Sequence, residues 1–118
     1  MDRRRVGPVV SQATFQALRR PDGRARRGPL AVRWVRLDGA DDEVQVSYAV
    51  SKRCGNAVRR NRIRRRTKSA IRQVSQGIPG GAYLITTEAE VATMNFQELT
   101  DQLSSALALA AGGSRSAR

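Results

Sequence analysis

Residues 52–72 of the chain read KRCGNAVRRNRIRRRTKSAIR, and this stretch contains no carboxylate. Charges of one sign at this density repel each other, so they require either bulk water or a polyanion opposite them. Guanidinium groups bind phosphate through two hydrogen bonds and also stack on bases, so an arginine-rich run favours contact with nucleic acid. The ten basic side chains are Lys52, Arg53, Arg59, Arg60, Arg62, Arg64, Arg65, Arg66, Lys68 and Arg72.

The same stretch has the pattern of an amphipathic helix. Asn56 directly follows Gly55 and is a favourable N-cap, which predicts a helix running to about Val74. At about 100° per residue, one narrow side is apolar and the opposite side is polar. We therefore expect one side to pack against a sheet and the other to form a positive ridge. The apolar side holds Ile63, Thr67, Ala70 and Val74 with Ile71 beside them, and the polar side holds Asn61, Arg65, Lys68 and Arg72.

The flanking segments predict a small sheet and two further helices. Residues 30–37, 43–50 and 82–87 read as strands, and the acidic turn between the first two predicts an antiparallel hairpin. Helices are predicted after Ser11, ending at Pro21, and after Asn95, while residues 23–29 hold at most a short edge strand. The order is α-β-β-(β)-α-β-α, which predicts an α+β fold with three to four strands covered by helices.

Composition limits the possible functions. The length of 118 residues suits a single domain (1–118), and the formal charge of +12 indicates that this domain binds RNA. The composition of the two ends predicts a basic flexible leader at residues 1–9 and a disordered tail at residues 111–118. No histidine is present, and Cys54 is the only cysteine, expected to be a small apolar residue at a strand-to-helix corner. No apolar run approaches the ~20 residues of a membrane span. Without a secretory signal pattern at the N-terminus, we expect a cytoplasmic protein.

RNA suits the basic stretch better than DNA. No recognition-helix signature accompanies the arginines, whereas contact with phosphates and 2′-hydroxyls of a folded RNA requires none. Trp34 is either a stacking platform for an unpaired base or a core tryptophan. A self-sufficient magnesium nuclease is an alternative, in which the carboxylates Asp38, Asp41, Asp42 and Glu43 would hold the metal, but turns favour aspartate for backbone reasons alone.

Ser51-Lys52-Arg53, Gly55-Asn56-Ala57-Val58 and the block from Arg60 to Arg65 closely resemble the signature of the protein subunit of bacterial ribonuclease P. The order of elements agrees over roughly residues 10–108. The resemblance implies a mixed sheet with a left-handed βαβ crossover, like the second domain of ribosomal protein S5. It also implies that a catalytic RNA removes the 5′ leader of precursor tRNA with Mg²⁺, one protein serving one RNA.

Carried onto this chain, the resemblance implies two groups of site residues, with no catalytic residue and no metal ligand among them. RNA-binding residues are Lys52, Arg53, Asn56, Arg59, Arg60, Asn61, Arg62, Arg64, Arg65, Lys68 and Arg72. A cleft for the 5′ leader is implied to contain Phe15, Val32 and Trp34. A second class of function stays open, namely a structural RNA-binding protein of the ribosomal type that stimulates no cleavage.

Overall fold

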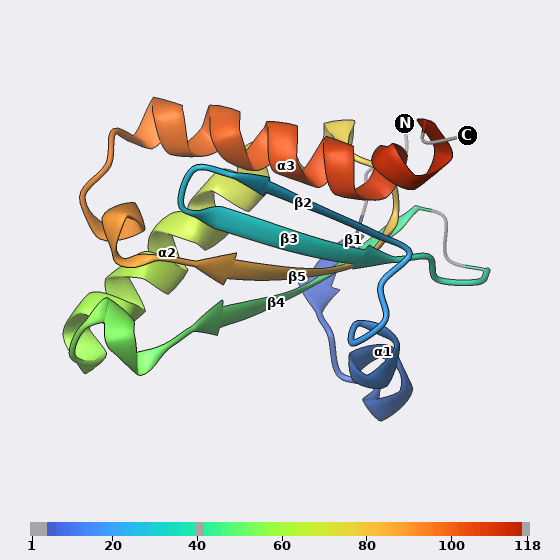
Figure 1. Ribbon diagram of the computed structural model, residues 1–118, viewed down its shortest axis with the longest axis horizontal. Helices are drawn as coiled ribbons and strands as arrows, with labels where there is room; N and C mark the ends of the chain where they lie inside the picture. Colours follow the sequence, from blue (N-terminus) through green and yellow to red (C-terminus); the bar gives the residue numbers. More distant parts are fainter. Residues whose placement is uncertain (1–4, 40–41, 117–118) are drawn as a thin grey trace.

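The computed structural model describes residues 5–39 and 42–116, which form a five-stranded mixed sheet with helices (Figure 1). Along the sheet the order is β1-β4-β5-β3-β2. β4 pairs in parallel with β1 and β5, whereas β3 pairs antiparallel with β5 and β2. The α+β class is confirmed. The strands are β1 (Arg5–Pro8), β2 (Gly23–Arg27), β3 (Leu30–Val35), β4 (Glu43–Val50) and β5 (Gly81–Thr87).

The helices begin where the cap residues predict. Ser11, Asn56 and Asn95 each accept a hydrogen bond from a backbone N–H in the first turn of the helix that follows. The first helix is shorter than predicted, because it ends before Leu18, which is buried. The helices are α1 (Gln12–Ala17), α2 (Ala57–Val74) and α3 (Phe96–Ser116), with short 3-10 turns η1 (Lys52–Cys54), η2 (Ser75–Gly77) and η3 (Ala89–Ala92).

The predicted hairpin between β3 and β4 is wrong, because β5 lies between these strands and pairs with both of them. β5 is the most buried strand, with Ala82, Tyr83 and Ile85 fully buried, so burial places it at the centre of the sheet. The sheet also has more strands than predicted. β2 is the edge strand that the sequence allowed, and β1 comes from a segment predicted to be flexible.

The leader predicted to be flexible and the tail predicted to be disordered both contain regular structure in the described residues. Residues 5–8 form β1, in which Val6 lies opposite Val44, and Pro8 ends an edge strand, where its missing N–H is tolerated. At the other end α3 continues through residues 111–116, and Ala110 and Ala111 are buried. Residues 1–4 and 117–118 lie outside the described part of the chain.

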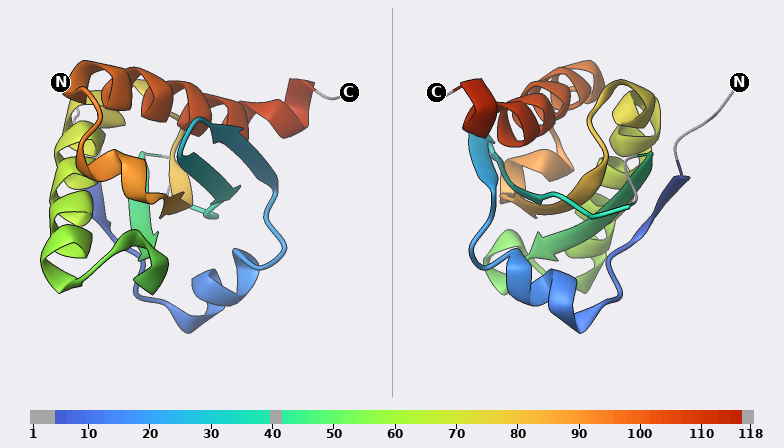
Figure 2. Two further views of the ribbon diagram at one scale, coloured as in Figure 1. Left: turned by 60° about the vertical axis from the view of Figure 1, so that its left-hand side comes forward. Right: turned by 90° about the vertical axis from the view of Figure 1, so that its right-hand side faces the viewer.

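Two apolar clusters lie on opposite faces of the sheet. The larger one joins Leu30, Val32 and Trp34 of β3 to the buried sides of α2 and α3. The smaller one joins Val35 and Ala82 to Leu18 beside α1. α2 and α3 therefore cover one face, while the other face is covered at one end only, beside α1 (Figures 1 and 2).

α2 connects two parallel neighbouring strands, β4 and β5, and crosses behind the sheet as drawn in Figure 1. Seen from the helix side with the strands pointing up, β5 lies to the left of β4, so the crossover is left-handed. This hand is rare for a βαβ unit.

Cys54 lies at the corner before α2 and is buried, as predicted, with its Sγ 3.4 Å from the carbonyl oxygen of Thr87.

Candidate nucleic-acid interface

α2 is fixed to the protein by its apolar side. Ile63, Thr67, Ala70 and Ile71 are buried, and Val74 at the end is half-buried, as the helical pattern predicts. The Thr67 hydroxyl donates a 2.8 Å hydrogen bond to the Ile63 carbonyl, so this polar group is satisfied within the core. The opposite side of α2 must therefore face solvent.

We call the exposed cationic side chains of η1 and α2, together with Asn56 and Asn61, the α2 ridge. Within the described residues, the one ion pair closer than 4.0 Å joins Arg26 to Glu88, far from this helix in sequence. No carboxylate of the described residues therefore lies within 4.0 Å of a ridge cation, which leaves this positive charge available to an external anion. The ridge consists of Lys52, Arg53, Asn56, Arg59, Asn61, Arg62, Arg65, Lys68 and Arg72.

Three arginines of α2 differ from the ridge. Arg60 and Arg64, both predicted to bind RNA, are half-buried, and Arg60 Nε donates to the Gly55 carbonyl at 3.2 Å. Arg66 donates to the carbonyl oxygens of Val91 at 2.7 Å and Met94 at 2.6 Å. Its guanidinium also lies 6.0 Å from the centre of the Phe96 ring. Arg66 therefore ties α2 to the turn before α3 and is committed to the fold.

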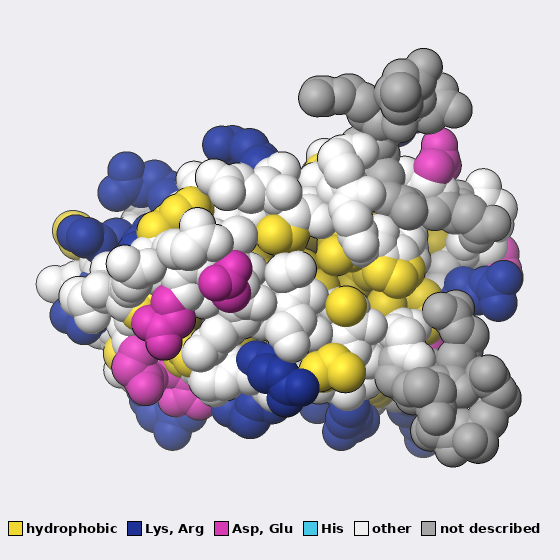
Figure 3. Space-filling model, turned by 90° about the horizontal axis from the view of Figure 1, so that it is seen from above, with side chains coloured by type: hydrophobic (Ala, Val, Ile, Leu, Met, Phe, Trp, Pro, Cys, Tyr) yellow, Lys and Arg dark blue, Asp and Glu magenta, His cyan; other side chains and the backbone are white. Residues whose placement is uncertain are grey.

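The side of the molecule over α3 has a different character (Figure 3). Uncharged and apolar side chains cover most of it, acidic groups gather at one end, and Lys and Arg lie toward the rim. Glu90, Glu98 and Asp101, in or just before α3, are all exposed. A polyanion would be repelled at this end, so the charge distribution directs it toward α2 and the sheet.

The three residues predicted to form the leader cleft do not lie on one face of the sheet. Val32 and Trp34 are 1% and 8% exposed and belong to the core beneath α2 and α3. Trp34 Nε1 donates to the Gly80 carbonyl at 3.1 Å, and a Cβ at Gly81 would overlap the indole. Trp34 is thus a core tryptophan, because strand alternation points it at the helices. Phe15, which is 43% exposed, lies on α1, beyond the other face of the sheet.

That other face, which we call the open face, was not singled out from the sequence. Arg24, Arg33, Leu84 and Ser47 lie opposite one another across β2, β3, β5 and β4. Arg24 and Arg33 are exposed, whereas Leu84 and Ser47 are half-buried. Arg33 also donates to the Leu18 carbonyl at 3.3 Å, which links the row to the end of α1 beside Phe15. An arginine alternating with buried Val32 and Trp34 was the sequence signal for this face.

Comparison with known proteins identifies the family of this chain. The family model described as Ribonuclease P matches residues 3–111. The chain belongs to the ribonuclease P protein family. The ribonuclease P protein component of Brucella suis is 37% identical over 103 residues, which cover 79% of this chain and 72% of that protein. The corresponding protein of Ruegeria pomeroyi is 40% identical over 91 residues, covering 71% and 73%.

The fold is also that of solved ribonuclease P proteins. The Thermotoga maritima protein superposes with a TM-score of 0.71 at 20% identity, over 85% of this chain and 94% of that one.

The carboxylates of the acidic turn were considered as metal ligands. In the present chain Asp38 and Asp42 are exposed, and Glu43 accepts a hydrogen bond from Gln45 at 3.1 Å. Asp41 lies outside the described residues. Among those that are described, no three His, Cys, Asp or Glu side chains gather as metal ligands, and no helix is long and apolar enough to span a membrane.

Proposed function

We propose that this chain is the protein subunit of a ribonuclease P ribonucleoprotein, which removes the 5′ leader of precursor tRNA by magnesium-dependent endonucleolytic cleavage. The observation that carries the proposal is the α2 ridge, exposed and without carboxylates, in a chain of this family. We expect a cytoplasmic complex of one protein with one RNA. The RNA phosphates would compensate the positive charge of the α2 ridge.

In this proposal the ridge docks on the catalytic RNA. α2 presents arginines at successive turns, so it follows a path of phosphates and needs no base-specific contact. The helix carries no carboxylate, so it offers Mg²⁺ no anionic ligand. The metal ions and the hydrolysis are accordingly assigned to the RNA, and the protein assists by neutralising phosphate repulsion where the metals gather. No autonomous protein active site is involved.

The open face is the proposed site for the single-stranded 5′ leader. The side chains of Ala31, Ser47 and Ala49 on this face are small. They leave room for an extended, single-stranded RNA to approach the sheet. Arg33 supplies positive charge within the face, and Phe15 supplies an exposed ring at its end. Stacking of a base on an aromatic ring contributes ~1–3 kcal/mol. Leader binding therefore belongs to Phe15 and the open face, in place of Val32 and Trp34.

Reconstitution tests the proposal. The chain is mixed with a ribonuclease P RNA and a precursor tRNA at a magnesium concentration where the RNA alone cleaves slowly. We expect faster release of the leader with the mature 5′ end unchanged. RNA binding without stimulation would instead identify a structural RNA-binding protein of the ribosomal type. Cleavage by the chain without any RNA subunit, abolished by neutralising Asp38, Asp41, Asp42 and Glu43, would identify a metal-dependent protein nuclease.

A further inference from the structure

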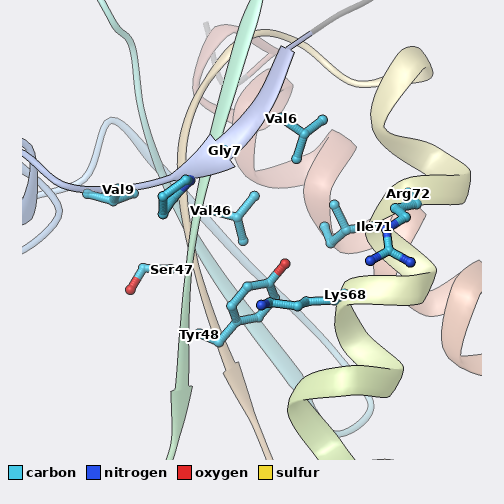
Figure 4. A pocket seen from close by; sticks show the side chains of 10 residues that line it. Val6, Gly7, Val9, Val46, Ser47, Tyr48, Lys68, Ile71 and Arg72 are labelled. Carbon is cyan, nitrogen blue, oxygen red and sulfur yellow. The ribbon is translucent and has the colours of Figure 1, made fainter.

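A cavity of 470 Å³ opens between the β1 edge of the sheet and α2 (Figure 4). Its volume falls within the ~300–1,000 Å³ typical of small-molecule sites. β1 and β4 supply one wall through Val6, Val46 and Tyr48, and α2 supplies the other through Ile71. Ser47 of the open face and Val9 also line the cavity, whereas the predicted leader residues Phe15, Val32 and Trp34 do not.

The lining combines an apolar interior with a cationic rim. Val46 and Ile71 are buried at 4% and 1% exposure, and Tyr48 is half-buried between β4 and α2. Lys68 and Arg72, one turn apart on α2, are exposed at the rim and have no carboxylate partner among the described residues. An occupant must therefore present a flat or apolar part to the interior and an anionic part to α2.

Tyr48 adds directional recognition to this lining. Burial raises its pKa to about 12, against a smaller opposing effect of the Arg72 charge. The phenol, whose ordinary pKa of 10.0 already lies above the physiological range, keeps its proton there, so its O–H is available as a hydrogen-bond donor. Its ring is also the one aromatic surface of the cavity lining.

We propose that this cavity binds one unstacked nucleotide, with its base against Val46, Ile71 and the Tyr48 ring and its phosphate on Lys68 and Arg72. A nucleotide matches both halves of the lining, since its base is planar and apolar on its faces and its phosphate is anionic. The two cations also belong to the α2 ridge, so the source of the nucleotide is the RNA that the ridge contacts. This inference rests on the proposed function, because it needs RNA at α2.

The free protein tests the chemistry of the cavity. NMR titrations compare AMP, adenosine and inorganic phosphate, following the amide signals of β1, β4 and α2. We expect AMP to bind more tightly than either part alone. Lys68→Gln should weaken AMP binding about fivefold, the size of one partly screened charge pair, and Lys68→Arg should restore it. Val6→Trp, at an exposed edge position, should fill the cavity and abolish AMP binding without changing the charge.

Arg27→Gln is the matched control, because Arg27 lies on β2 and donates to Ser105 on α3, away from the cavity. It should leave AMP affinity unchanged. Equal affinity for AMP and phosphate, or unchanged binding in Val6→Trp, would overturn the cavity as a nucleotide site and leave only general attraction of anions.

Photocrosslinking distinguishes an RNA nucleotide from a free one. A benzophenone side chain replaces Pro8, an exposed residue of the cavity lining, or Val58, which is 79% exposed at the start of α2. We expect both positions to crosslink to ribonuclease P RNA in the assembled complex, with position 8 reaching a single-stranded nucleotide. Crosslinks from position 58 alone would overturn the cavity proposal while supporting the proposed function. No crosslink from either position would contradict both.

Discussion

Arg65 and Arg66 are neighbours in the sequence, yet the structure assigns them opposite tasks. Arg65 is an exposed residue of the α2 ridge, whereas Arg66 is held by two carbonyl groups beside α3. We predict that Arg66→Ala lowers the free energy of unfolding while Arg65→Ala lowers RNA affinity. The two substitutions remove the same side chain and the same charge, so each serves as the control for the other.

The expected magnitude follows from the contacts of Arg66. Hydrogen bonds to a charged group contribute ~1.5–3 kcal/mol each, and a partly exposed cation–π contact adds ~0.5–1 kcal/mol. Arg66 has two such bonds and one such contact, but it is only half-buried, so water compensates for part of their removal. We expect the free energy of unfolding to fall by about 2–4 kcal/mol, a large fraction of the ~5–15 kcal/mol typical of a domain. Arg65→Ala should stay within ~0.5 kcal/mol.

Urea unfolding measures the first effect, and the salt dependence of RNA binding measures the second. For Arg65→Ala the slope of log affinity against log salt should fall by up to ~0.7–0.9 for each phosphate that the side chain no longer neutralises. At temperatures where Arg66→Ala is folded, its slope should equal that of the wild type. Unchanged stability in Arg66→Ala together with a reduced slope would refute the reasoning and make Arg66 an RNA ligand.

Phe15→Ala should weaken binding of precursor tRNA with a long 5′ leader but leave binding of mature tRNA unchanged. Trp34→Ala should instead lower the free energy of unfolding by about 3–5 kcal/mol. If folded Trp34→Ala lost affinity only for the leader, Trp34 would have its predicted role in leader binding. Asn56→Ala should cost about 1 kcal/mol of stability through loss of the α2 cap, and Asn56→Asp, which keeps the cap, should not. Tyr48 stabilises the fold fully below pH 10 and progressively less from pH 10 toward about 12, because the unfolded chain loses the phenol proton first. In Tyr48→Phe the alkaline fall in stability, measured by urea unfolding at each pH, should be shallower than in the wild type.

Local patterns in the sequence predicted the positions of α2, β4 and β5 and the caps of all three helices. Asn56 is a representative case, because its cap depends only on the residues that follow it. The buried side of α2 was predicted correctly for the same reason, since one helical turn fixes which side chains share a face. The α2 ridge followed from these two predictions.

Long-range pairing could not be predicted in this way. A hairpin between β3 and β4 satisfies every local preference, and only the placement of β5, 30 residues further along after α2, excludes it. β1 was not predicted, because a segment of four residues next to basic side chains is too short to show a periodic pattern. Its strand conformation depends on pairing with β4, in which Val6 lies opposite Val44.

The burial of Val32 and Trp34 could not be predicted for a related reason. Strand alternation correctly grouped Val32 with Trp34 and separated both from Arg33, but it did not indicate which face α2 and α3 cover. The helices cover the apolar face, so the exposed face is the one with Arg33. To assign RNA contact to Arg33 in place of its neighbours Val32 and Trp34, one would have needed to know the order of the strands in the sheet.

The central claim is that the α2 ridge docks on a catalytic RNA and thereby promotes cleavage. The most direct test measures single-turnover cleavage of precursor tRNA at low magnesium with three versions of the chain. These are the wild type, Arg62→Gln/Arg65→Gln on the ridge, and Arg27→Gln/Arg36→Gln elsewhere, the last two having equal net charge. We predict that the wild type and the Arg27/Arg36 variant stimulate cleavage and that the ridge variant does not. Equal stimulation by both double variants, or none by the wild type, would contradict the claim.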